Sequence, residues 1–183
     1  MNTAVRGPVT VAAKPIGPAG AVAPAPRWAR RAAHVAALVA LPSSLWRLGL
    51  ALGFPLGYTD QGLRALVGPS VWGPFYLVAL SVLSEIAAVL TLGLVQRWGE
   101  VVPRWVPVVG GKNIPRKAVL IPAWIGGAVH TALWTQLLAW WAIPHTNMTQ
   151  TGATVVGFIY LPLVAWAPLM AAATLSYQRR HRR

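Results

Sequence analysis

"VWGPFYLVALSVLSEIAAVLTLGLV", residues 71–95, is a run of 25 residues in which Glu85 is the only charged side chain. As an α-helix the run is about 37 Å long, whereas the hydrocarbon core of a bilayer is about 30 Å thick and needs roughly 20 residues. A surface helix of a soluble protein would carry polar residues along one face, and this run does not. The run is therefore typical of a membrane-spanning helix.

Three further apolar runs lie on either side of this one along the chain, at residues 32–54, 118–142 and 153–176. Each is long enough to cross a bilayer, and each is too long and too continuous for a strand of a membrane barrel. Because only helices or closed barrels satisfy the backbone in lipid, the runs predict helices. The expected fold is all-α, with a four-transmembrane-helix bundle over residues 32–176.

The composition favours the same class of protein. Apolar residues make up 56% of the 183 residues and charged residues 10%, whereas ordinary soluble domains have about 25% charged residues. There is no cysteine, which excludes disulfides and thiolate metal sites. The net charge of +13 falls in three blocks between apolar runs rather than on one polar face, so anionic lipid headgroups, and not nucleic acid, are the expected counter-charge.

The positions of the cations predict the orientation of the chain. Lysine and arginine next to membrane spans are retained on the cytoplasmic side, and fourteen of the sixteen precede the first span, follow the fourth, or lie between the second and third. Both termini are therefore expected in the cytoplasm, with a disordered Pro/Ala-rich basic tail at 1–31 and a short basic tail at 177–183. The expected location is the cytoplasmic membrane, and the Arg-, Ala- and Pro-rich composition favours a bacterial source.

The loop between the second and third runs mixes tryptophan, proline and cations. Tryptophan prefers the headgroup level and arginine reaches lipid phosphates from there, while Gly99, Pro103 and Pro107 end regular structure. We expect an interfacial anchor, with a specific anionic-lipid or partner site as the alternative. The residues expected to make these contacts are Arg97, Trp98, Arg104, Trp105, Lys112, Arg116 and Lys117.

This loop also carries a resemblance. "LGLVQRWGEVVPRWVPVVGG" (92–111), with "LPSSLWRLGLALGFPLG" (41–57) upstream, resembles a group of uncharacterised multipass membrane proteins of actinobacteria. The likeness covers about residues 41–130 and is most specific at the W-G-E-x-x-P-R-W-x-P core. It implies a multipass membrane location and topology, and it implies no catalytic residue, because the group has no assigned activity.

Three ionisable side chains, Arg47, Glu85 and His130, lie within the expected spans. An ionisable residue at membrane depth costs about 2.5–3.5 kcal/mol on insertion scales, so each needs a reason. Each lies on a stripe of small and polar residues at helical spacing, which predicts one intramembrane polar cluster in the bundle interior. The simplest pairing is Arg47 with Glu85, although Arg47 could instead reach the outer interface. Glu85 could be ion-paired, protonated and hydrogen-bonded, or used in proton handling, and His130 is expected to hydrogen-bond between helices.

Two local features are also predicted. Proline inside a helix removes a hydrogen bond and clashes with the preceding turn, so kinks are expected in the first and fourth helices. The prolines concerned are Pro42, Pro162 and Pro168. Residues 57–68 are compatible with a short interfacial helix that is capped by Thr59 or Asp60 and ended by Gly68, although the favoured interpretation is that this segment simply closes the outer end of the bundle.

Motifs of known chemistry, including phosphate-binding loops and zinc-protease or serine-hydrolase signatures, are missing from the sequence. No catalytic, cofactor-binding or metal-binding residue is predicted, and enzymatic activity is left open but not favoured. The favoured function is a non-catalytic membrane subunit or scaffold, as a homo-oligomer or with other membrane subunits. The alternative is a small transporter or proton-handling protein that uses Arg47, Glu85 and His130.

Overall fold

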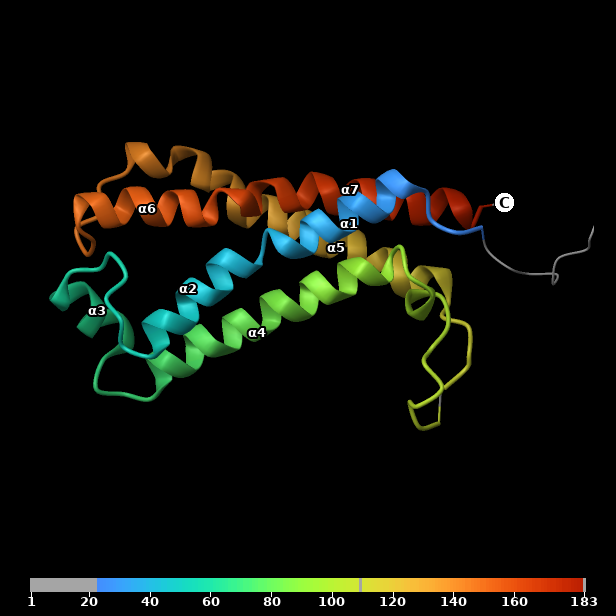
Figure 1. The fold of residues 1–183 in the computed structure, drawn as a ribbon, viewed down its shortest axis with the longest axis horizontal. Coiled ribbons are helices and arrows are strands. Elements are labelled where there is room, and N and C mark those ends of the chain that lie inside the picture. Colours follow the sequence, from blue (N-terminus) through green and yellow to red (C-terminus); the bar gives the residue numbers. More distant parts are fainter. Residues whose placement is uncertain (1–22, 109, 183) are drawn as a thin grey trace, which may run out of the picture.

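The computed structural model describes residues 23–108 and 110–182, and this part of the chain is helical, without extended strands (Figure 1). Four helical spans in the described residues are long and apolar enough to cross a membrane, as expected: Arg27–Ala51, Trp72–Gly93, Arg116–Ala142 and Gln150–Arg180. The elements in chain order are α1 (Arg27–Leu38), α2 (Leu41–Ala51), α3 (Asp60–Val67), α4 (Trp72–Gly93), the 3-10 turn η1 (Arg97–Gly99), α5 (Arg116–Thr135), the 3-10 segment η2 (Gln136–Ala142), α6 (Gln150–Tyr160) and α7 (Pro162–Arg180).

The first span begins at Arg27, earlier than the expected start at residue 32. Residues 27–31, which were expected in the disordered tail, form the first turn of α1. The physical reason is that Ala29 begins a fully buried alanine stripe, so this turn gains packing while its arginines stay on the exposed side. The remainder of the expected tail, residues 1–22, lies outside the described residues.

Proline interrupts two of the four spans. The junction between α1 and α2 immediately precedes Pro42, and the junction between α6 and α7 immediately precedes Pro162. At both positions the missing N–H and the bulk of the ring end one helix, and a second helix starts with proline in its first turn. By contrast, α7 continues past Pro168 without interruption and ends at Arg180 instead of residue 176.

The spans pack in the order α5, α7, α1, α4, so that α7 contacts both α5 and α1, and α4 contacts α1 and α2. Figure 1 shows α4 and α7 along opposite edges of the molecule. Close packing at the centre depends on α1, whose buried alanines include Ala29, Ala33 and Ala36. Small side chains let helix backbones approach closely, which is the main source of helix association in lipid.

Large apolar side chains cover the outside of the bundle. On α4 the exposed residues include Phe75, Val82, Leu83, Ile86 and Leu90. A soluble protein with such an apolar surface would aggregate, whereas the acyl chains of a bilayer solvate it without cost. The exposed apolar surface is therefore suited to a bilayer and agrees with the four helices that are long and apolar enough to cross one.

The short helix considered for residues 57–68 is present as α3. Thr59 is its N-cap, where Oγ1 accepts a hydrogen bond from the Gly62 N–H at 3.0 Å, and Gly68 is its C-cap. The start of α6 repeats this arrangement, because Thr149 Oγ1 accepts from the Gly152 N–H at 3.0 Å. Both helices thus begin with a Thr-x-x-Gly segment.

These two segments, residues 57–62 and 147–152, bind each other reciprocally, and we call the pair the Thr-x-x-Gly clasp. The Thr59 N–H donates to the Asn147 carbonyl at 3.1 Å, and the Thr149 N–H donates to the Gly57 carbonyl at 3.0 Å. A Cβ atom on Gly152 would collide with the Gly57 carbonyl oxygen. The clasp therefore requires glycine at this position and joins α3 to α6 at the end of the bundle opposite the basic loop (Figure 1).

Candidate functional site

Arg47 is buried between α2 and α4, with 2% of the residue exposed. Its guanidinium donates four hydrogen bonds, all to hydroxyl oxygens. The acceptors are Ser81 (3.2 Å from Nε), Ser44 and Ser84 (3.2 and 3.0 Å from Nη2) and Tyr160 (3.5 Å from Nη1). Hydroxyls satisfy the donors without cancelling the charge. Arg47 therefore belongs to the bundle interior and does not extend to the outer interface.

Glu85 does not form the expected ion pair with Arg47, since no Arg47 nitrogen lies within 4.0 Å of a Glu85 oxygen. The serines of α4 occupy that position instead: Ser81 and Ser84 precede Glu85 on the same helix and bind the guanidinium. Glu85 Oε1 is buried and has no hydrogen-bond partner among the described residues. A buried polar oxygen without a partner is costly and calls for an explanation.

A groove between α2 and α4, with a volume of about 380 Å³, contains Glu85. Its other walls are mostly apolar, including Leu48 of α2 and Val82, Ile86 and Val89 of α4. Ile86 and Val89 are themselves exposed on the outside of the bundle. The groove therefore opens on the outside of the bundle and brings a carboxyl group to an otherwise apolar lateral surface.

His130 lies on the face of α5 that packs against α7. Its Nε2 is 3.0 Å from the Leu163 carbonyl oxygen, and its ring meets the Trp166 ring at a centroid distance of 4.6 Å. The expected interhelical hydrogen bond is confirmed. In the described part of the chain no hydrogen bond joins His130 to Arg47 or Glu85, so the three ionisable residues occupy three separate sets of contacts.

A second groove, between α4 and α5, was not anticipated from the sequence. Its volume is about 500 Å³, and α7 forms its floor through Trp166 and Met170. It exists because α4 packs on α1 and α2 while α5 packs on α7, so that two consecutive spans leave a gap between them. The loop after α4 closes one end of the gap with Trp98, Pro103 and Ile114. We call it the α4–α5 groove.

The basic loop places its predicted contact residues in different environments. Trp98 packs against Gly93 at the end of α4 and its Nε1 donates to Gln96 Oε1 at 2.7 Å, so it is part of the groove wall. Trp105 is 84% exposed, and Arg116 is partly buried and donates to the His181 carbonyl at 3.4 Å. The cations exposed to the surroundings are Arg97, Arg104, Lys112 and Lys117.

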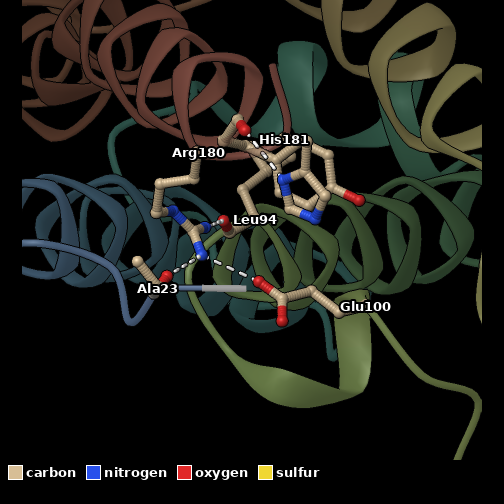
Figure 2. Close-up of polar contacts among 6 residues, drawn as sticks. Ala23, Leu94, Glu100, Arg180 and His181 are labelled. Atoms are coloured by element: carbon tan, nitrogen blue, oxygen red, sulfur yellow. Dashed lines mark hydrogen bonds and ion pairs between the residues drawn. The ribbon is translucent and has the colours of Figure 1, made fainter. Parts of the chain in front are cut away.

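Arg180, at the end of α7, fastens this loop to the bundle (Figure 2). Nη1 is 2.7 Å from Glu100 Oε1 and 3.1 Å from the Ala23 carbonyl, and Nη2 is 2.8 Å from the Leu94 carbonyl. The two charged side chains are only 9% and 19% exposed. We call these contacts the Arg180 latch. It joins the start of the described chain, the end of α4, the loop and α7 at one end of the molecule.

Comparison with known proteins found no relative of this chain. No family model, curated protein or solved structure matches the chain. The candidate sites therefore depend on their own geometry: the buried Arg47 network, the Glu85 groove, the α4–α5 groove and the Arg180 latch.

Sequence reasoning missed Tyr160, Glu100 and Arg180. Glu100 gave a usable signal, because it is the one acidic residue in a loop that contains five cations. The sequence could not indicate which cation it binds, since its partner lies 80 residues away at the end of a different span. Tyr160 gave none, because an isolated tyrosine within an apolar run is common near membrane interfaces.

Removing one hydroxyl from the Arg47 network should destabilise the fold. In Ser81→Ala, Nε of Arg47 loses its acceptor in a buried site, which costs about 1–3 kcal/mol of unfolding free energy. The measurement is unfolding of detergent-solubilised protein followed by tryptophan fluorescence. The control is Thr154→Ala, where an exposed hydroxyl that bonds only the Gln150 carbonyl is lost. Equal stability of the two variants would contradict a structural role for the network.

Proposed function

We propose that this chain is a non-catalytic subunit or scaffold of a cell membrane, and that it binds a second transmembrane helix at the Glu85 groove. The observation that carries the proposal is the Glu85 carboxyl group, whose Oε1 has no partner among residues 23–108 and 110–182 and which lines a groove on the outside of the bundle. In hydrocarbon no solvent molecule can supply the missing donor, so a polar group on another membrane helix would remove the cost once the carboxyl group turns into the groove to meet it. The partner is accordingly a helix with a small apolar face and a hydrogen-bond donor near its centre.

The Arg47 network supports a scaffold over a carrier. Four hydroxyl acceptors hold the guanidinium, and the residue is almost fully buried. A transport site has to open to water and exchange its partners, whereas this network would have to break four hydrogen bonds to do so. Its role is to fix α2 against α4 and thereby shape the Glu85 groove.

The same carboxyl group favours a second candidate, a proton-handling membrane protein. An unpaired carboxyl at membrane depth can gain and lose a proton, and proton relays in membranes use such groups. In that case Glu85 would act by ionisation, not as a hydrogen-bond acceptor for a partner helix. The two functions differ in what a glutamine at position 85 should do, because glutamine accepts hydrogen bonds but does not titrate.

Two substitutions at Glu85 test the proposal. A particle released from native membranes with a mild detergent should exceed the 19.6 kDa of one chain after detergent correction, as measured by light scattering. Glu85→Leu should release the partner, and Glu85→Gln should keep it through the amide oxygen. Thr131→Leu, a polar-to-apolar change on the exposed side of α5, is the matched control.

The outcome separates the candidates. Assembly that survives Glu85→Leu, or a wild-type particle with the mass of one chain, would overturn the subunit proposal. Proton-dependent activity in reconstituted vesicles that is lost equally in Glu85→Gln and Glu85→Leu would assign proton handling instead. A particle mass of two chains would identify the partner as a second copy.

We also propose that the end of the molecule with the Arg180 latch faces the cytoplasm in the plasma membrane of a bacterium. The support is that the start of the described chain, the basic loop and the end of α7 meet there through Arg180 (Figure 2). Cations near spans are retained on the cytoplasmic side, and this end carries nearly all the lysines and arginines of residues 23–108 and 110–182.

A further inference from the structure

The α4–α5 groove presents mostly apolar side chains to a ligand and few unused hydrogen-bonding groups. Apart from Trp98, Trp166, His130 and Thr91, it is lined by aliphatic residues, methionine, glycine and proline, including Leu90, Pro122 and Gly126. A volume of about 500 Å³ is in the range of ligand sites in proteins. Because the groove lies between two membrane spans and not inside the bundle, its open side faces acyl chains.

The polar side chains that line the groove already have partners. Thr91 Oγ1 donates to the Ala87 carbonyl at 2.9 Å and is 3.4 Å from Trp166 Nε1. His130 Nε2 lies 3.0 Å from the Leu163 carbonyl, and Trp98 Nε1 donates to its own loop. A polar solute would therefore lose its hydration without gaining hydrogen bonds, whereas an acyl chain would lose nothing.

The length of the groove matches one leaflet. Along α5 it extends from Ala118 to His130, a rise of about 18 Å at 1.5 Å per residue. One leaflet of a hydrocarbon core of about 30 Å is roughly 15 Å deep. An acyl chain whose headgroup lies beside the basic loop would thus reach the level of His130, where the groove ends.

The closed end of the groove is positively charged. Arg104 follows the groove residue Pro103, Lys117 precedes the groove residue Ala118, and both cations are exposed. The only acidic side chain of the loop, Glu100, is neutralised by Arg180. Cations at the headgroup level attract anionic lipid, each contributing about 1 kcal/mol near the surface.

From these four observations we propose that the α4–α5 groove binds one anionic phospholipid, with an acyl chain along α5 and the phosphate beside Arg104 and Lys117. This site is separate from the Glu85 groove and does not depend on the proposed partner helix. Trp98 and Gly99 form the end of the groove that the Arg180 latch holds in place. The loop therefore acts as a lipid-binding element and not only as an interfacial anchor.

Two neighbouring glycines provide the first test. A Cβ on Gly126 would meet only the flexible Met170 Cε, at 3.6 Å, so Gly126→Leu is accommodated by the backbone and its side chain fills the groove. Gly127 does not line the groove, and a Cβ there would meet nothing within 4 Å in the described residues. Gly127→Leu is therefore a matched control on the same helix.

The measurement is native mass spectrometry of the detergent-purified protein titrated with dioleoyl phosphatidylglycerol or dioleoyl phosphatidylcholine. The wild type should bind one phosphatidylglycerol in preference to phosphatidylcholine. Gly126→Leu should weaken this binding by about tenfold or more, because its four carbons displace acyl methylenes, while Gly127→Leu should bind as the wild type does. Equal binding by the two variants would overturn the proposal.

Charge variants test the headgroup independently of the groove. Arg104→Gln combined with Lys117→Gln should weaken phosphatidylglycerol binding by about tenfold and leave phosphatidylcholine binding unchanged. The control is Arg64→Gln, which removes an exposed cation on α3 at the far end of the molecule. If the preference for phosphatidylglycerol falls equally in the double variant and in Arg64→Gln, the proposal is wrong. It would also be overturned if the groove of the wild type cross-links to a second polypeptide and retains no lipid.

Discussion

Gly152→Val should lower the stability of the protein more than Arg180→Ala or Ser81→Ala does. A Cβ at this position collides with the Gly57 carbonyl, and its next contacts are also backbone atoms that cannot rotate away. Relieving the collision requires α6 to separate from the α3 loop, which breaks the hydrogen bonds of the Thr-x-x-Gly clasp. We expect a loss of about 3 kcal/mol, at the upper end of the cost of overpacking.

Thermal unfolding in detergent, followed by tryptophan fluorescence, measures this loss. Gly127→Val is the control, because it introduces the same side chain into a helix where no described atom lies within 4 Å. Its cost should be only the lower helix propensity of a β-branched residue, offset by the removal of glycine. Midpoints that agree for the two variants would show that the clasp does not hold the two helices together.

Arg180→Ala should have the second largest effect. It removes an ion pair with Glu100 and two hydrogen bonds to carbonyl oxygens, and it leaves the Glu100 carboxylate mostly buried without its cation. Removing one partner of a buried pair costs about 3–5 kcal/mol, and the partial exposure of Glu100 reduces the expected loss to about 2–3 kcal/mol. The loop should also become accessible to protease, since its main tie to α7 is gone.

Arg179→Ala is the matched control for the latch, because Arg179 is the exposed neighbour on the same helix turn. The stability of Glu100→Gln should lie between those of Arg180→Ala and Arg179→Ala, because Arg180 keeps its hydrogen bonds to the Ala23 and Leu94 carbonyls. The readouts are the unfolding midpoint and the rate of trypsin cleavage in the loop. A stable, protease-resistant Arg180→Ala protein would show that packing alone holds the loop.

Much of the architecture could be predicted because lipid imposes simple rules on sequence. A continuous apolar run of more than 20 residues has few alternatives to a spanning helix, and all four runs form helical segments that are long and apolar enough to cross a membrane. The N-cap Thr59 and C-cap Gly68 of α3 were predictable for a similar reason, since capping depends on residues within one turn. The breaks before Pro42 and Pro162 are likewise local effects.

The pairing of polar groups could not be predicted in the same way. Arg47 and Glu85 are of opposite charge and at similar depths, yet the guanidinium binds the hydroxyls of Ser81 and Ser84. The rotation of α4 about its own axis decides which of these side chains it meets. That rotation follows from packing against α1 and α2, which no local pattern encodes.

The sequence alone determined the number of spans, their approximate ends and the apolar character of the surface, because each depends on the transfer of a continuous segment from water to lipid. The tertiary structure alone decided that α4 and α5 stand apart, that Glu85 Oε1 has no hydrogen-bond partner in the described part of the chain, and that Arg180 binds Glu100. These features arise from contacts between segments far apart in the chain, where the shapes of whole helices determine which side chains come within hydrogen-bonding distance.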